Sequence, residues 1–144
     1  MGTICFVILN YKTWREAAAC AESILKTQQG QDIRIVLVDN GSGNGSEESL
    51  REEFAGEKRV HVIASEKNLG FARGNNLGIR YARSHFEPDF IVAANSDIIF
   101  EQEDYCEKLR EIYKEERFDI LGGDIVDARA PDILIRWRET GSTR

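Results

Sequence analysis

The sequence predicts an α/β fold: a mostly parallel, doubly wound sheet flanked by helices. Two observations favour it. Short, nearly continuous apolar runs rich in β-branched residues are typical of strands covered on both faces. These runs alternate along the chain with segments of helical periodicity, which indicates right-handed βαβ units. The 144 residues hold no internal repeat or linker, so a single domain over 1–144 is expected.

The first two predicted strands, Ile4–Leu9 and Ile33–Val38, enclose a helix. Thr13 and Glu16 match a capping box at its start, and Gly30 is predicted to stop it. The apolar side chains of this helix share one stripe, formed by Trp14, Ala17, Ala18, Ala21, Ile24 and Leu25.

The rest of the chain continues the alternation of helices and strands. Ser46 is expected to cap the next helix, because it precedes two glutamates that suit a first turn. Gly122 and Gly123 interrupt the last predicted strand. In chain order, the expected elements are a helix over Ser46–Phe54, a strand over Val60–Ala64, a helix over Phe71–Ser84, a strand over Phe90–Ala94, a helix near Asp104–Glu116 and a strand over Ile120–Val126.

Composition excludes several classes of function. Nineteen basic and 25 acidic residues give a net charge of -6, which argues against nucleic acid as a partner. The longest apolar run, Ile4–Leu9, is far shorter than the roughly 20 residues of a membrane span, so no transmembrane segment is expected. The odd number of cysteines, without metal-like spacing, predicts reduced thiols and a cytoplasmic protein. The apolar segment Ile133–Trp137 favours self-association.

Polar side chains cluster where the predicted strands end. Ligands of open parallel sheets bind in the crevice beyond the carboxyl ends of the strands, so such clusters would share one edge. Small polar residues also form ordinary turns, which is the simpler explanation for any single cluster. Four clusters together predict a binding site, and they are Asn10-Tyr11, Asp39–Ser42, Ser65–Gly70 and Asn95–Asp97.

Asp39 is the candidate for recognising a base or a ribose, since a carboxylate at a strand end can accept hydrogen bonds from either. Asn40 beside it is equally suited to satisfying the amides of its own turn. A dinucleotide fingerprint is a weaker interpretation. Gly41 and Gly43 fit it, but Ser46 stands at the third glycine position and the turn follows the second strand.

The segment from Lys67 to Phe86 carries four basic residues and no acid, within a chain of net charge -6. Arg73 falls in the first turn of the predicted helix, where the helix dipole disfavours a cation, so it indicates an anionic partner. Gly74 and Gly78 are explained by close packing of this helix on the sheet.

Asn95 and Asp97 lie two residues apart at the end of a buried strand. They are too few to hold a metal alone, but they suit Mg²⁺ or Mn²⁺ if a diphosphate and water supply the other oxygens. A strand-end turn is the alternative for this tripeptide.

Together these motifs resemble the nucleotide-binding half of a family-2 glycosyltransferase with the GT-A fold. Within that family, the resemblance is to the bacterial branch with rhamnosyltransferase-like enzymes of surface polysaccharide assembly. It spans residues 4–126 and is carried by Val7–Tyr11, Val38–Ser42, Asn68–Asn76 and Asn95–Asp97.

The resemblance implies a role for each candidate residue. Asp39, with Asn40 beside it, would bind the uracil or thymine of the donor. The backbone near Asn10 and Tyr11 would line the base pocket.

The diphosphate side follows in the same way. Asn68, Gly70 and Arg73 would lie along the nucleotide and diphosphate. Asp97 would bind the metal, and Asn95, an amide where the family has an acid, would serve the ribose instead.

The resemblance further implies an inverting enzyme that transfers a sugar from a UDP- or dTDP-sugar to a saccharide or lipid-linked acceptor. It would act in cell-surface polysaccharide assembly, in the cytoplasm at the inner face of the membrane. Family members continue into an acceptor-binding half, so the catalytic base is expected beyond residue 144 and none is nominated here. A non-catalytic nucleotide-sugar-binding module is the alternative, and a dinucleotide-dependent oxidoreductase a remote third.

Overall fold

The structure is a computed structural model, and it describes residues 2–122, 125–127 and 130–135. The chain divides into two compact units, residues 1–106 and 107–144. The first unit contains the four-stranded sheet and all the candidate site residues.

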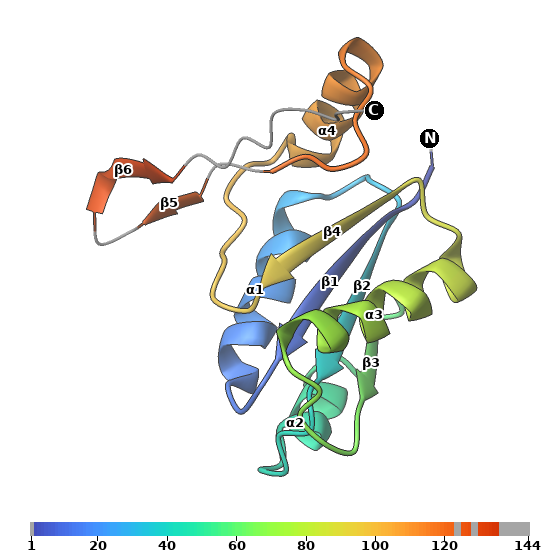
Figure 1. The fold of residues 1–144 in the computed structure, drawn as a ribbon, viewed down its shortest axis with the longest axis vertical. Helices are drawn as coiled ribbons and strands as arrows, with labels where there is room; N and C mark the ends of the chain where they lie inside the picture. The colour runs from blue at the N-terminus through green and yellow to red at the C-terminus, as the bar shows by residue number, and fades with distance from the viewer. Residues whose placement is uncertain (1, 123–124, 128–129, 136–144) are drawn as a thin grey trace. The chain divides into compact units, whose positions relative to one another are not determined.

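The sheet consists of β1 (Ile4–Asn10), β2 (Ile33–Asp39), β3 (Val60–Ala64) and β4 (Phe90–Asn95). All neighbours are parallel, and the strand order is β3-β2-β1-β4 (Figure 1). The order reverses between β1 and β4, which is where ligands bind in doubly wound sheets. The predicted fold class is confirmed, and each of the four strands lies within one residue of its expected bounds.

Helices cover both faces of this sheet. α1 (Trp14–Thr27) and α2 (Ser46–Glu53) pack against each other behind the sheet in Figure 1, and α3 (Phe71–Phe86) crosses in front of it. Side chains alternate between faces along a strand, so β1 and β2, which are buried over nearly their whole length, supply both layers of the core. The layer under α3 contains Val7, Val38 and Ala82, all fully buried.

Two glycines let α3 approach the sheet closely. If Gly78 had a side chain, its Cβ atom would collide with the sheet, lying 2.5 Å from Cγ1 of Val7 and 2.8 Å from Cγ2 of Val38. A Cβ atom on Gly74 would lie 2.7 Å from Cδ1 of Leu9 and 3.0 Å from Nδ2 of Asn40. Close packing, as expected from the sequence, therefore explains both residues and brings the start of α3 to the end of β2.

Two predicted helix starts are wrong in detail. Thr13 precedes α1, but its side chain makes no capping hydrogen bond; its carbonyl accepts the N–H groups of Glu16 and Ala17 instead. Ser46 is the first residue of α2 rather than its cap, and its N–H donates to Oδ1 of Asn44 at 3.2 Å. Local side-chain geometry decides these bonds, and residue type alone does not fix it.

The stop signal of α1 also differs from expectation. The helix ends at Thr27, with Gln28 as its C-cap, and Gly30 lies beyond it in the turn to β2 with φ of 78°. The C-cap residue is thus a buried glutamine, whose side-chain partners are described below.

The second unit holds a correction to the sequence analysis. α4 (Tyr105–Glu115) begins at the end of the first unit, as expected. The predicted strand Ile120–Val126 is wrong over residues 120–122, which form no strand; residues 123–124 lie outside the described residues. β5 (Ile125–Asp127) instead pairs with β6 (Ala130–Ile135) in a separate antiparallel sheet.

Other expectations concern the whole chain. No helix among the described residues has the length and apolarity needed to cross a membrane. The three cysteines are buried thiols that take part in no disulfide among the described residues. Of the predicted apolar segment Ile133–Trp137, the part up to Ile135 belongs to β6 and the rest lies outside the described residues.

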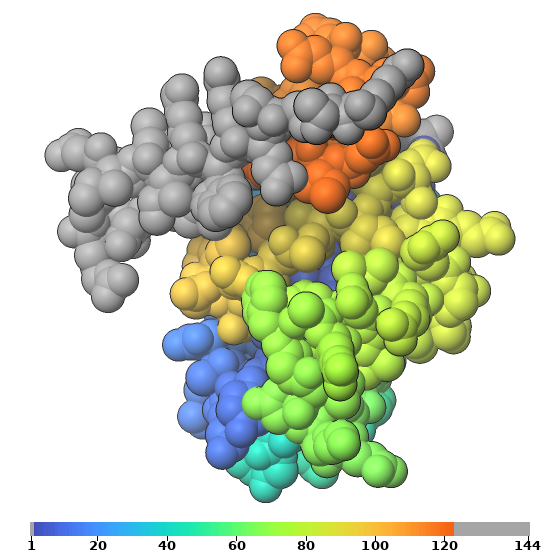
Figure 2. Space-filling model, viewed as in Figure 1, coloured from blue at the N-terminus to red at the C-terminus, as the bar shows by residue number. Residues whose placement is uncertain are grey.

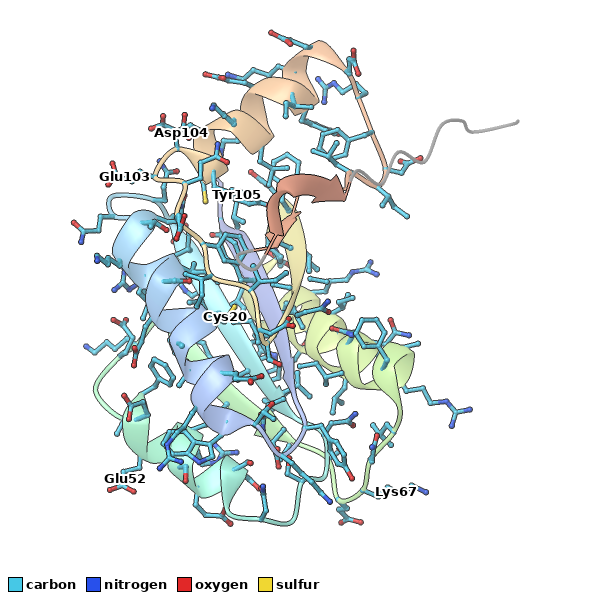
Figure 3. All side chains as sticks on the ribbon, turned by 90° about the vertical axis from the view of Figure 1, so that its left-hand side faces the viewer. Cys20, Glu52, Lys67, Glu103, Asp104 and Tyr105 are labelled. Carbon is cyan, nitrogen blue, oxygen red and sulfur yellow. The ribbon has the colours of Figure 1, made fainter. Side chains whose placement is uncertain are left out.

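Gln28 anchors the segment that follows β4. Its side chain is fully buried; Nε2 donates to the carbonyl of Gln102 at 2.7 Å, and Oε1 accepts the N–H of Cys106 at 3.1 Å. The N–H of Phe100 donates to Oγ of Ser23 at 2.9 Å. In Figure 3 the labelled Glu103, Asp104 and Tyr105 mark this segment beside the end of α1. The segment that leaves Asp97 is therefore attached to α1.

Replacing Gln28 with alanine should destabilise the protein by about 2–3 kcal/mol, because it empties a fully buried position and removes two hydrogen bonds, one to the carbonyl of Gln102 and one to the buried N–H of Cys106. Urea denaturation measures the change. Gln29→Ala is the matched control, since Gln29 is exposed and its loss should cost less than about 0.5 kcal/mol. Equal effects of the two variants would contradict the anchoring role.

Candidate nucleotide-binding site

The four polar clusters lie at one edge of the sheet. Asn10 and Asp39 are partners in the β1–β2 register, and Leu9 is the partner of Asn95 in the β1–β4 register. The N–H of Ser65 donates to the carbonyl of Asp39 at 3.0 Å, which joins the end of β3 to the same edge. Adjacent strands are about 4.8 Å apart, so the ends of β2 and β4 are separated by about 10 Å.

Asp39 is a buried carboxylate with unequal oxygens. It is 4% exposed, and its Oδ1 accepts hydrogen bonds from Nδ2 of Asn10 at 2.9 Å and from Oγ of Ser42 at 2.5 Å. Ser42 in turn accepts the N–H of Lys12 at 2.8 Å. Oδ2 has only a long contact of 3.4 Å with the N–H of Ser42 within the described part of the chain. Oδ2 is therefore the atom that can accept a hydrogen bond from a ligand.

A hollow of about 330 Å³ opens beside this carboxylate. Glycines form much of its wall, and a Cβ atom on Gly43 or Gly45 would meet nothing within 4 Å. At these two glycines the wall is bare backbone with open space beside it. Its lining includes Asp39, Gly41, Gly43, Gly45, Ser65 and Glu66.

Asn40 points to the other side, toward the loop before α3. It is 3% exposed; its Nδ2 donates to Oδ1 of Asn68 at 3.1 Å and to the carbonyl of Gly70 at 3.2 Å. Its Oδ1 accepts the N–H of Leu69 at 3.0 Å. The structure thus brings Asn40, Asn68 and Gly70 together in one network.

The start of α3 is positively charged and lies at the same edge of the sheet. Gly70 precedes the helix with φ of 83°, the first turn contains no acid, and Arg73 is exposed there. Arg73 has no ion pair with any of the described acids. A helix N-terminus with an added cation favours an anion. Phe71, 70% exposed, and Tyr11, 42% exposed, are exposed aromatic residues at this edge.

Asn95 and Asp97 are exposed at the end of β4, where the carbonyl of Asn95 accepts the N–H of Ile98 at 3.1 Å. Cys20 of α1 lies close by, and its Sγ is 3.8 Å from the carbonyl oxygen of Asn95. Burial and the nearby charge of Asp97 raise the pKa of Cys20 to about 12. The thiol therefore stays protonated at neutral pH.

In the described ranges, no group of three or more His, Cys, Asp or Glu side chains could hold a metal ion. Asp97 is the one carboxylate of its turn, with the amide oxygen of Asn95 as a second donor. Oxygen donors of this kind fit Mg²⁺ or Mn²⁺, provided that a bound diphosphate and water complete the coordination.

Sequence reasoning missed two features of this site. Asn10 was expected to act through its backbone, but its side chain binds Asp39. Ser42 was not singled out, although Asp and Ser are both common turn residues and a serine hydroxyl can donate to a nearby carboxylate.

The sequence matches the model of the family "Glycosyl transferase family 2" over residues 5–143. Glycosyltransferase GlyG of Streptococcus pneumoniae is 33% identical over 121 residues, which cover 84% of this chain and 38% of GlyG. The chain thus spans well under half the length of this relative.

Solved structures share the fold. The mannosyltransferase PcManGT of Pyrobaculum calidifontis, in complex with GDP-Man and Mn²⁺, superposes with a TM-score of 0.62 at 16% identity, covering 72% of this chain and 30% of PcManGT. S. aureus TarS 1-349 in complex with UDP-GlcNAc gives a TM-score of 0.64 at 17% identity, with coverage of 78% and 31%. Both likenesses concern the fold.

Gly41 allows the loop after β2, which lines the hollow, to contact the loop before α3. It has φ of 67°, and a Cβ atom there would lie 2.2 Å from the carbonyl carbon of Lys67. Figure 3 shows the labelled Lys67 on this loop, with its side chain pointing away from the protein. The two loops therefore touch through their backbones.

Gly41→Ala should destabilise the protein by about 1–3 kcal/mol more than Gly43→Ala, because the added methyl group collides with the backbone of Lys67. Gly43 is a matched control, since its φ of 63° imposes the same left-handed strain of about 1–2 kcal/mol with no atom in the way. Urea denaturation compares the two. Equal losses would show that the loops are free to separate.

Proposed function

The chain belongs to glycosyl transferase family 2, and from this premise we propose that it binds the nucleotide-sugar donor of a transfer reaction, with UDP or dTDP as the nucleotide. In this proposal, the hollow at Asp39 binds the base of the nucleotide, and the start of α3 binds its negatively charged phosphates. This polarity fits a nucleoside diphosphate, which has a neutral base at one end and negative charge at the other.

The choice of UDP or dTDP as the nucleotide rests on one atom of Asp39, the carboxylate oxygen Oδ2. Uracil and thymine present one N–H donor, N3–H, between two carbonyls. Guanine presents two adjacent donors, which a carboxylate accepts with both oxygens. Since Asn10 and Ser42 occupy Oδ1, only Oδ2 remains for a base. A uracil or thymine base is therefore favoured over guanine.

The diphosphate is proposed to lie at the start of α3, where Asn68, Gly70 and Arg73 stand together. Free N–H groups of the first turn and the guanidinium group of Arg73 would neutralise its charge. Asp97, assisted by Asn95, would hold Mg²⁺ or Mn²⁺, which supplies positive charge to the leaving nucleoside diphosphate.

The proposed reaction of the whole protein is transfer of the sugar to a saccharide or lipid-linked acceptor with inversion, in bacterial cell-surface polysaccharide assembly. A carboxylate would take the acceptor proton, and we assign this role to no residue of the chain.

The proposed location is the cytoplasm, at the inner face of the membrane. The name of GlyG supports glycosyl transfer. A non-catalytic binding module is the alternative, which slow hydrolysis of a bound donor would exclude.

Asp39→Asn should weaken UDP binding about 10-fold or more, because the amide that replaces Oδ2 would oppose N3–H of uracil with another donor. Calorimetric titration of the chain with UDP measures this, and the same titration with GDP should show weaker binding to the unmodified chain. Glu52→Gln is the control, since it removes one negative charge from an exposed position of α2 outside the lining of the hollow and should change UDP affinity less than about twofold. Tighter binding of GDP than UDP would overturn the choice of base.

Asp97→Asn should abolish the effect of metal on UDP binding. Mn²⁺ is expected to raise the UDP affinity of the unmodified chain at least about fivefold over EDTA, a typical coupling between two ligands. The variant should give equal affinities in Mn²⁺ and EDTA, while uridine, which has no phosphate, should bind both proteins alike. A variant that keeps the Mn²⁺ effect would place the metal elsewhere.

A further inference from the structure

We propose that Asn40 is a positioning residue: it fixes the start of α3, and so the diphosphate-binding groups, relative to the base-binding carboxylate of Asp39. The inference rests on the proposed function. It differs from the sequence-based expectation, in which Asn40 itself binds the nucleotide sugar.

Both the nitrogen and the oxygen of the Asn40 side-chain amide have hydrogen-bond partners within the protein. Both hydrogen-bond partners of Nδ2 and the nearer donor to Oδ1 belong to residues 68–70, at 3.0–3.2 Å, and Oγ of Ser65 is a more distant donor to Oδ1 at 3.5 Å. With 3% exposure and these partners, the side chain has no face left for a ligand. Its backbone N–H is also engaged, by the carbonyl of Asn10 at 2.8 Å.

One of these bonds reaches the first turn of α3 directly. The carbonyl of Gly70 accepts both Nδ2 of Asn40 and the N–H of Gly74, at 3.2 and 3.0 Å. The absent side chain of Gly74 makes room for the amide, because a Cβ atom there would lie 3.0 Å from Nδ2 of Asn40. Asn40 therefore determines where the helix begins and how near it stands to β2.

Asp39 and Asn40 are consecutive, so their side chains leave the chain in opposite directions. Asp39 lines the hollow on one side, and Asn40 binds the loop on the other. Covalent bonds limit how far the diphosphate of a nucleotide can lie from its base, and productive binding tolerates misplacement of only about 0.5 Å. A rigid link between two adjacent residues meets this requirement, and Arg73 follows in the same turn.

The test compares two ligands that differ by the diphosphate. Uridine affinity, from an NMR titration, reports on the base side; UDP affinity, from calorimetry in EDTA, reports on both sides. Asn40→Ala should leave uridine affinity within about twofold and reduce UDP affinity about 10-fold, because the first turn of α3 and Arg73 lose their fixed position. Amide hydrogen exchange at Leu69 and Gly70 should accelerate in the same variant.

Two further variants complete the design. Asn40→Asp keeps the shape and the acceptor for Leu69 but loses both donors, so it should show the same selective loss of UDP if Asn40→Ala folds poorly. Asn76→Ala removes an exposed asparagine of α3 and should change neither affinity. Figure 2 shows the outward side of this helix, in green.

The outcomes separate the possibilities. Equal losses of uridine and UDP affinity would mean that Asn40 contacts the base or supports the site as a whole, and would overturn the inference. Unchanged affinity for both ligands would overturn it as well. Failure of the unmodified chain to bind UDP would instead refute the proposed function on which the inference rests.

Discussion

The hydrogen bonds to the buried carboxylate of Asp39 are the constraint on which the rest of the structure depends. A charge that is 4% exposed is costly unless it is paired, and Asn10 and Ser42 provide the pairing. A shift of β1 against β2 by one residue would turn the side chain of Asn10 to the other face and leave the carboxylate unpaired. The register that builds the sheet is therefore the register that builds the site.

Much of the fold follows from the sequence because its signals are repeated over many residues. The apolar runs that became β1 and β2 are six residues or more, and the stripe of α1 recurs over several turns. The failures concern single bonds or weak signals. The capping role of Thr13 depends on the rotamer of one side chain, and Ile120–Val126 is a short apolar segment broken by glycines. Periodicity cannot decide such cases.

The candidate site is predictable to a different extent. Residue type and position along the chain indicate two of its residues. Asp39 is a carboxylate at the end of a strand, and Arg73 is a cation in the first turn of a helix, where the helix dipole disfavours it unless an anion binds. The partners of each polar atom are not predictable in this way. Whether Asn40 faces the hollow or the loop depends on how closely α3 packs against β2, which Gly74 and Gly78 allow. Such distances arise from the packing of elements far apart in the sequence.

A protein of net charge -6 can bind an anionic ligand because charge acts locally. Exposed charges are screened over about 8 Å at physiological salt, so those near the ligand decide the interaction. Glu47, Glu48 and Glu66 line the hollow beside Asp39, whereas Arg73 stands at the start of α3. A nucleoside diphosphate placed with its base in the hollow meets acids at its N–H donor and a cation at its phosphates; the reverse placement would bring phosphates against four carboxylates. The charge distribution of this edge thus sets the direction in which the nucleotide lies.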